Sequence, residues 1–331
     1  MPPRVLVSPI EMTMKPARWH EILSAAGFEI VCRPDSLWLR DPVKLLEYVQ
    51  AEKIDAIVAG LENVNRQVLE SGHLRAVARY GVGYDSVDVA AATERGIPVT
   101  ITPGVNHIAV AEHTIGMIFG LLRVVVDRDA GVRDGSWRRY PNPRLAGKTL
   151  GLVGLGRIGK AIVPRAQGLE VNVIAYDPYP DREFADKHDV RLCSLDEIWS
   201  DSDIVSLHLP GSPGSKPLVD RQTLAKMRRG AILINTARGV LVDEDALADA
   251  LVEGQIGGAG LDCFVVEPLP TTSRLNQAPN VLLSPHVAGQ DHESAAGAGS
   301  LSCECLARLY HGQELPPGCC VNPTVLAGWK W

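Results

Sequence analysis

The sequence predicts an α/β protein built from two parallel-sheet domains. Short apolar runs of strand length alternate with helical patterns through the first hundred residues, and the same alternation restarts at Thr149. The chain has 331 residues, which exceeds one typical domain, so we expect two hydrophobic cores.

The first half of the chain supplies one set of elements. Short runs of apolar residues predict strands at residues 5–7, 29–32, 56–59, 76–80 and 98–101. Segments in which apolar residues recur with helical spacing predict helices at residues 17–26, 42–51 and 87–95.

The second half repeats the pattern. Strands are expected at residues 150–153, 171–177, 231–235, 258–262 and 281–284, and helices at residues 158–166 and 291–309. We expect the helix over 291–309 to return to the first domain, because residues 281–284 already form a late strand of the second sheet.

A long apolar segment, residues 106–126, joins the two halves and is expected to be one helix. Glu112, His113 and Arg123 interrupt it, which favours a buried or interface helix over a membrane span. The following residues, 134–143, contain Gly and Pro and are expected to form a loop or arm.

Composition excludes several classes of protein. The formal net charge is -6, and the basic residues are scattered, so a nucleic-acid partner is not expected. The first residues lack the apolar region of a signal peptide. We therefore expect a cytoplasmic protein with neither a membrane nor a nucleic acid as its partner.

The seven cysteines form an odd number. Cys32, Cys193 and Cys263 lie in apolar stretches and are expected to be small core residues. The tail places Cys303, Cys305, Cys319 and Cys320 around His311, but zinc sites more often use a C-x2-C spacing. We expect free thiols and no metal, and a redox role at the surface stays open.

The most informative motif lies at the start of the second domain. Gly154, Gly156 and Gly159 form G-x-G-x-x-G between the strand at 150–153 and the helix at 158–166. Gly154 suits a tight turn, Gly156 lets a pyrophosphate approach the backbone, and Gly159 lets the helix pack closely on its strand. Unpaired N–H groups at the helix start attract phosphates. This order of elements predicts a dinucleotide site.

Asp177 selects the dinucleotide. It ends the strand at 171–177, about twenty residues beyond the glycine motif, where a carboxylate accepts hydrogen bonds from the adenosine ribose. The same charge repels a 2′-phosphate, so NAD is favoured over NADP.

Three polar residues follow later strands of the second sheet. Arg238 follows residues 231–235, Glu267 follows 258–262, and His286 follows 281–284. Each has a structural reading when taken alone, as a surface cation, a turn residue or a structural histidine. Together they suit hydride chemistry on a 2-oxo acid. Arginine binds the carboxylate in a bidentate manner, and histidine, stabilised as a cation by glutamate, supplies a proton to the ketone oxygen.

These motifs resemble the NAD-dependent D-isomer-specific 2-hydroxyacid dehydrogenases, oxidoreductases that act on the CH–OH group of donors. The matching segments, in chain order, are residues 81–88, 102–106 with 111–113, 150–159, 203–210, 234–239, 260–262 with 267–270, and 284–286. The resemblance implies a Rossmann NAD-binding domain, residues 103–289, inserted into a flavodoxin-like substrate-binding domain made of residues 1–102 and 290–331. It also implies a homodimer built on the nucleotide domains.

The resemblance assigns roles to individual residues. Arg238 would hold and polarise the substrate, Glu267 would orient and charge His286, and His286 would donate or remove the proton. Residues matching positions that line NAD are Gly154, Gly156, Arg157, Ile158, Gly159, Asp177, Leu209, Pro210, Ser215, Thr236, Ala237, Arg238, Asp262, His286, Ala288 and Gly289. Residues matching substrate contacts are Val82, Gly83 and Asn106, with Arg79 and Arg139 as candidate phosphate contacts.

Within the family the nearest resemblance is to 3-phosphoglycerate dehydrogenases, which makes 3-phosphoglycerate/3-phosphohydroxypyruvate the first expectation for the substrate pair. Arg79 and Arg139 match phosphate-binding arginines of such relatives, and Arg139 would reach across the dimer. Two departures favour the alternative, a hydroxypyruvate or glyoxylate reductase: Ala59-Gly60 replaces a frequent Arg-Ser pair, and the chain stops at Trp331 without room for a regulatory domain.

An alternative of another class is an NAD(H)-sensing binding protein, similar to the corepressors related to this family. Two loops around the expected substrate, residues 8–18 and 61–65, would set which side chain is accepted.

Overall fold

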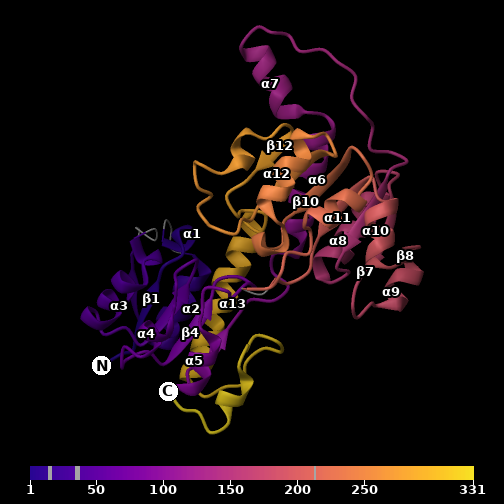
Figure 1. Cartoon of the computed structure of the whole chain (residues 1–331). Helices are drawn as coiled ribbons and strands as arrows, with labels where there is room; N and C mark the ends of the chain where they lie inside the picture. Colours follow the sequence, from indigo (N-terminus) through magenta and orange to yellow (C-terminus); the bar gives the residue numbers. More distant parts are fainter. Residues whose placement is uncertain (14–16, 34–37, 212–213) are drawn as a thin grey trace. The chain divides into compact units, whose positions relative to one another are not determined.

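The structure is a computed structural model that describes residues 1–13, 17–33, 38–211 and 214–331. Residues 14–16 of the predicted substrate loop lie outside the described residues. The chain divides into two compact units, Met1–Asn106 with Gln290–Trp331, and His107–Gly289 (Figure 1). We describe each unit separately.

The first unit contains a five-stranded parallel sheet in the order β2-β1-β3-β4-β5, the flavodoxin-like order. Its strands are β1 (Arg4–Val7), β2 (Glu29–Cys32), β3 (Ala56–Ala59), β4 (Ala76–Arg79) and β5 (Val99–Thr100). Successive side chains of a strand point to opposite faces, so Leu6 enters one hydrophobic cluster while Val5 and Val7 enter another. Both faces of this sheet are therefore covered.

Four helices of the first unit begin at polar caps, whereas α2 (Arg18–Ala26) begins after Ala17 without a side-chain cap. Asp41, Asn65, Asp88 and Asp291 each accept a hydrogen bond from a backbone N–H in the first turn of the helix that follows. The helices are α1 (Ile10–Thr13), α2 (Arg18–Ala26), α3 (Pro42–Ala51), α4 (Arg66–Leu69), α5 (Val89–Glu94) and α13 (His292–Tyr310), with short 3-10 turns at Trp38–Arg40 and Pro323–Leu326. The tail helix α13 packs against α2, so its predicted return to the first domain is confirmed.

The second unit contains a seven-stranded parallel sheet in the order β12-β11-β10-β9-β6-β7-β8. Read from β6, this is the doubly wound order of a Rossmann domain with one further strand. The strands are β6 (Thr149–Val153), β7 (Asn172–Tyr176), β8 (Arg191–Leu192), β9 (Ile204–Leu207), β10 (Ala231–Asn235), β11 (Ile256–Leu261) and β12 (Val281–Leu283). The prediction of two parallel-sheet α/β domains is thus confirmed.

Helices cover both faces of the second sheet, and two hydrophobic clusters fill the space beneath them. The covering helices are α6 (His107–Leu122), α8 (Arg157–Gln167), α9 (Arg182–Lys187), α10 (Leu195–Asp201), α11 (Arg221–Lys226) and α12 (Glu244–Val252), with 3-10 turns at Gly239–Leu241 and Arg274–Gln277. Helix α7 (Val125–Arg133) instead projects away from the sheet, and of its residues only Gly131 is buried (Figure 1).

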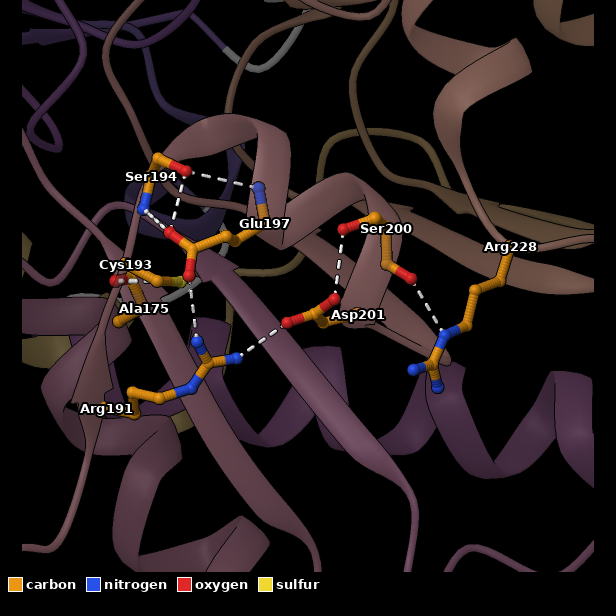
Figure 2. A network of polar contacts seen from close by, with 8 residues as sticks. All are labelled: Ala175, Arg191, Cys193, Ser194, Glu197, Ser200, Asp201 and Arg228. Atoms are coloured by element: carbon orange, nitrogen blue, oxygen red, sulfur yellow. Dashed lines mark hydrogen bonds and ion pairs between the residues drawn. The ribbon is translucent and has the colours of Figure 1, made fainter.

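Figure 2 shows how the short helix α10 is held. Ser194 and Glu197 form a capping box, in which the Glu197 carboxylate accepts from the Ser194 amide at 2.8 Å. Arg191, next to this cap, bridges Glu197 and Asp201 at 3.1 and 2.8 Å. The guanidinium of Arg228 donates to the Ser200 carbonyl at the other end of the helix. Polar contacts therefore compensate for the helix's short length.

Two predictions were wrong. The helix expected over residues 106–126 ends at Leu122, because Val124 adopts a left-handed conformation with φ 49°, and α7 starts anew at Val125. Cys32 is exposed and Cys193 partly exposed, since they end or follow edge strands, whereas Cys263 is buried as expected.

The described residues contain no single helix that is both long and apolar enough to cross a membrane. The pair α6 and α7 passes that test jointly, but with a bend of 57° between the two helices.

Candidate active site

The glycine turn after β6 has the geometry that a dinucleotide needs. Gly154 has φ 109°, and a Cβ there would lie 2.6 Å from the His208 carbonyl oxygen. A Cβ at Gly159 would lie 2.3 Å from the Gly154 carbonyl oxygen, so only glycine lets α8 sit this close to its strand. A Cβ at Gly156 would meet no described atom within 4 Å, so this backbone borders open space. The start of α8 is left accessible to a pyrophosphate.

Asp177 follows β7 and lies beside this turn. Its two carboxylate oxygens accept hydrogen bonds from the backbone N–H groups of Leu155, at 2.7 Å, and Tyr179, at 2.8 Å. The first bond ties the acid to the glycine turn itself. The carboxylate is therefore held in place before any ribose binds, and the residues present fit NAD.

The loops that follow β9, β10 and β11 pack tightly on one another. A Cβ at Gly239 would lie 2.0 Å from the Phe264 carbonyl carbon, and one at Gly211 would lie 2.9 Å from Cβ of Arg238. Asn235 donates to the Arg238 carbonyl at 2.8 Å, and Arg238 donates from Nη1 to the Ala237 carbonyl at 2.7 Å. The position of Arg238 is thus fixed by its own loop and by its neighbours.

Glu267 and His286 form the central polar pair. Nδ1 of His286 lies 3.0 and 2.9 Å from the two carboxylate oxygens of Glu267, and the Phe264 amide donates to the same carboxylate at 3.0 Å. The His286 backbone is left-handed, with φ 58°, a conformation that non-glycine residues adopt at a cost and often at functional sites. With Nδ1 engaged by Glu267, Nε2 is the nitrogen that can exchange a proton with a substrate.

Asp262 holds the loop that carries His286. Its carboxylate is 2% exposed and accepts from the Ser284 hydroxyl at 2.5 Å and from the amides of Val287 and Ala288 at 2.9 and 2.8 Å. Nε2 of His113, on α6, lies 3.0 Å from the same hydroxyl. Since the single proton of Ser284 goes to Asp262, His113 is the donor in this contact.

The residues predicted to line NAD share one location. In the second unit they all lie at or just beyond the carboxyl ends of strands, where ligands of open parallel sheets bind. They follow β6 (Gly154, Gly156, Arg157, Ile158, Gly159), β7 (Asp177), β9 (Leu209, Pro210, Ser215), β10 (Thr236, Ala237, Arg238), β11 (Asp262) and β12 (His286, Ala288, Gly289).

The predicted substrate residues divide between the units. Arg79, Val82, Gly83 and Asn106 belong to the first unit, and Arg139 belongs to the exposed segment after α7 in the second. Their role in binding stays a prediction.

Sequence reasoning missed three residues. Ser284 and His113 lay inside segments that carried the resemblance, but no spacing rule indicated their contact. Glu62 falls in the loop 61–65 that was expected to lie near the substrate, but nothing in the sequence indicated that its carboxyl would be 1% exposed.

Burial changes two further groups near the strand ends. It lowers the pKa of His208 to about 3, and Nδ1 of this ring is inaccessible and has no partner in the described part of the chain. His208 as a residue is partly exposed, so we attribute the lowered pKa to the surroundings of its ring, whose Nδ1 is inaccessible and whose Nε2 lies 2.8 Å from the Ser206 hydroxyl. Burial also raises the pKa of the Cys263 thiol, so this cysteine stays protonated and unreactive. Among the described residues, no group of three or more His, Cys, Asp or Glu could hold a metal ion.

The fold and this site define a dinucleotide-binding oxidoreductase of the Rossmann class. Residues 115–288 match the family model described as "D-isomer specific 2-hydroxyacid dehydrogenase, NAD binding domain". The chain belongs to the D-isomer-specific 2-hydroxyacid dehydrogenase family, and it is an NAD-dependent oxidoreductase.

Individual relatives agree on the family and differ in name. A glyoxylate reductase of Korarchaeum cryptofilum is 38% identical over 284 residues, 83% of this chain and 85% of that protein. D-3-phosphoglycerate dehydrogenase 2 of Arabidopsis thaliana is 40% identical over 267 residues, 80% of this chain but only 43% of that protein. The chain thus spans less than half of that relative. The crystal structure of the TT0316 protein from Thermus thermophilus has a TM-score of 0.85 at 35% identity and covers 96% of this chain and 99% of its own.

Proposed function

We propose that this protein interconverts a small D-2-hydroxy acid and its 2-oxo acid, with Arg238, Glu267 and His286 as its catalytic residues. The observation that carries the proposal is the pairing of His286 Nδ1 with both oxygens of Glu267, at 3.0 and 2.9 Å. That pairing leaves Nε2 for the substrate and places a carboxylate where it would balance a positive charge on the ring.

In the oxidation direction, Nε2 of His286 would remove the proton of the C2 hydroxyl while the C2–H bond breaks with its electron pair. NAD, when bound at the glycine turn, supplies the acceptor for this hydride and returns it in reduction. In the reduction direction, His286 would give its Nε2 proton to the ketone oxygen. Glu267, paired with Nδ1, would hold the ring in place and balance the positive charge that His286 gains in oxidation.

Arg238 would bind the substrate carboxylate. Its guanidinium is planar and presents paired N–H groups that match a carboxylate, and its loop is fixed by the packing of Gly239 on Phe264. A fixed cation of this kind also polarises the neighbouring carbonyl, which favours hydride addition at C2.

Two substrate pairs are candidates. For 3-phosphoglycerate/3-phosphohydroxypyruvate, the support is the match of Arg79 and Arg139 to phosphate-binding arginines and the phosphoglycerate dehydrogenases among the relatives. For hydroxypyruvate or glyoxylate, the support is Ala59-Gly60 in place of Arg-Ser and the glyoxylate reductases that this chain matches over most of their length.

We also propose that the protein acts as a homodimer built on the second unit. Helix α7 and the segment after it expose a set of apolar side chains that a partner would cover: Val125, Val126, Val132, Trp137 and Tyr140. Arg139, the second phosphate candidate, lies within this segment. Location in the cytoplasm stays a prediction.

The test is NADH oxidation by the purified protein with 3-phosphohydroxypyruvate, hydroxypyruvate, glyoxylate and bulkier 2-oxo acids. The proposal requires turnover on at least one of them and, with the preferred acid, clear preference for NADH over NADPH. Tight NADH binding with no turnover on the whole panel would refute it and favour a sensing role.

A further inference from the structure

A buried polar cluster lies at the carboxyl edge of the first unit's sheet. Ser8 follows β1, Glu62 lies just beyond β3, and Arg79 ends β4, and these three strands are neighbours in the sheet. The Ser8 hydroxyl donates to the Val58 carbonyl at 3.0 Å and accepts from the Gly60 amide at 3.4 Å. Ligands of parallel sheets bind outside this edge, so the cluster sits where a substrate contact is expected.

Glu62 is the unusual member. Its side chain is 1% exposed, and its Oε2 has no hydrogen-bond partner in the described ranges. Burial raises its pKa. Hydrogen bonds from its own amide, the Ser8 hydroxyl and the Gly60 amide, and after them the Arg79 charge, act in the opposite direction. A Cβ at Gly60 would lie 3.3 Å from Oε2, so the carboxyl folds back over its own loop. Burial of an acid at this depth requires a compensating charge or hydrogen bonds.

Hydrogen bonds supply part of that compensation, and Arg79 adds a charge close by. Arg79 lies opposite Ala59 in the pairing of β3 with β4, and its position is set by the backbone. Its Nη1 donates to the carbonyls of Ala59 and Tyr80, and a Cβ at Gly81 would lie 3.3 Å from the same nitrogen. A guanidinium whose charge acts on a buried carboxyl has less of its field available to a phosphate dianion. The neighbouring Ala59 and Gly60 add no cation.

We propose that Glu62 determines substrate specificity by balancing Arg79, so that this edge accepts a 2-oxo acid with an uncharged end, a hydroxyl or a hydrogen, and disfavours a phosphorylated one. The inference rests on the proposed function and selects between its two substrate candidates. Glu62 is a positioning residue here, because it acts on the substrate through Arg79.

The experiment compares wild type with Glu62→Gln, which keeps shape and removes charge, and with Glu62→Asp, which keeps charge. For each protein kcat/KM is measured with 3-phosphohydroxypyruvate and with hydroxypyruvate, and each value is divided by that for glyoxylate, which has no C3 group. The ratio of the two normalised values is the measure of specificity. We expect wild type to favour hydroxypyruvate. Glu62→Gln should shift the ratio at least about ten-fold toward the phosphorylated acid, through its KM, and Glu62→Asp should shift it far less.

A wild-type preference for the phosphorylated acid overturns the inference, and so does an unchanged ratio in Glu62→Gln. If Glu62→Gln does not fold, the same ratio of kcat/KM values is measured for Arg79→Gln. If Glu62 balances Arg79, the substitution should lower kcat/KM for both acids by a similar factor. If Arg79 binds phosphate, kcat/KM for the phosphorylated acid should fall at least about thirty-fold more than that for hydroxypyruvate. Absence of turnover on all three acids would instead overturn the proposed function, so the two failures are distinguishable.

Discussion

Replacing Asp262 by Asn tests how the His286 loop is held. The buried carboxylate accepts three hydrogen bonds, from the Ser284 hydroxyl and from the amides of Val287 and Ala288. The most favourable orientation of an asparagine side chain here directs its amide oxygen toward Ser284 and Val287, which keeps two of the three bonds. Its NH2 group then faces the N–H of Ala288, so one bond to a charged acceptor is lost and two donors oppose each other.

The size of the effect follows from that geometry. A hydrogen bond to a charged group contributes about 1.5–3 kcal/mol, and a buried unsatisfied donor adds to the loss. We therefore expect the free energy of local opening of this loop to fall by about 2–4 kcal/mol. Amide hydrogens that exchange through this opening should then exchange at least about thirty-fold faster. Because catalysis needs a fixed His286, kcat should fall by about a hundred-fold.

The assay is hydrogen exchange of peptides that contain Val287 and Ala288, together with kcat. Asp201→Asn is the matched control, since Asp201 pairs at the surface with Arg191 (Figure 2) and its loss should cost about 0–1 kcal/mol. If Asp262→Asn exchanges no faster than the control at these amides, the loop is held by something else and the reasoning fails.

Three further predictions concern other parts of the second unit. Glu267→Gln should lower kcat by about 10–100-fold by removing the carboxylate that orients and balances His286. Glu244→Gln should not lower kcat, because Glu244 accepts from the Val265 amide and, within the described part of the chain, makes no hydrogen bond to His286, and equal effects of the two substitutions would contradict the pairing. Asp177→Asn should raise the ratio of kcat/KM for NADPH to that for NADH by about ten-fold, because a charge that repels a 2′-phosphate is gone, and an unchanged ratio would place the ribose elsewhere. The pKa of His208 is lowered to about 3, so as the pH falls below about 6.5 the unfolded chain takes up a proton at this ring and the folded chain does not. The free energy of unfolding should therefore decrease by up to about 1.4 kcal/mol per pH unit between about pH 6 and pH 4. Urea titrations of His208→Gln should lack that part of the decrease.

The sequence predicted the glycine turn after β6, because glycine is the one residue type that fits such a turn. Gly154 and Gly159 were expected from motif spacing, and each occupies a place that a Cβ would overlap. Arg238, Glu267 and His286 were predicted from their positions after strands, since parallel strands share a carboxyl edge. Their strand-end positions also predicted that Glu267 would pair with His286, but which ring nitrogen is engaged depends on how two loops fold back.

Other features depend on tertiary structure that no local pattern carries. The break between α6 and α7 is set by the left-handed Val124, a residue that gives no turn signal. Asp262 was predicted to line NAD, yet what fixes its role in the fold is the direction of two backbone amides and one hydroxyl. Glu62 reads as an ordinary loop acid, and its burial shows only when β1, β3 and β4 lie side by side.

The most direct test of the account is turnover by His286→Ala beside wild type, with the preferred 2-oxo acid and with NADH affinity measured by fluorescence on both proteins. If His286 is the proton donor, NADH binding should change by less than about three-fold while kcat falls by at least about a thousand-fold, since the donor is lost and the glycine turn is untouched. A variant that binds NADH normally and retains near-normal kcat would contradict the assignment of His286 and with it the proposed mechanism.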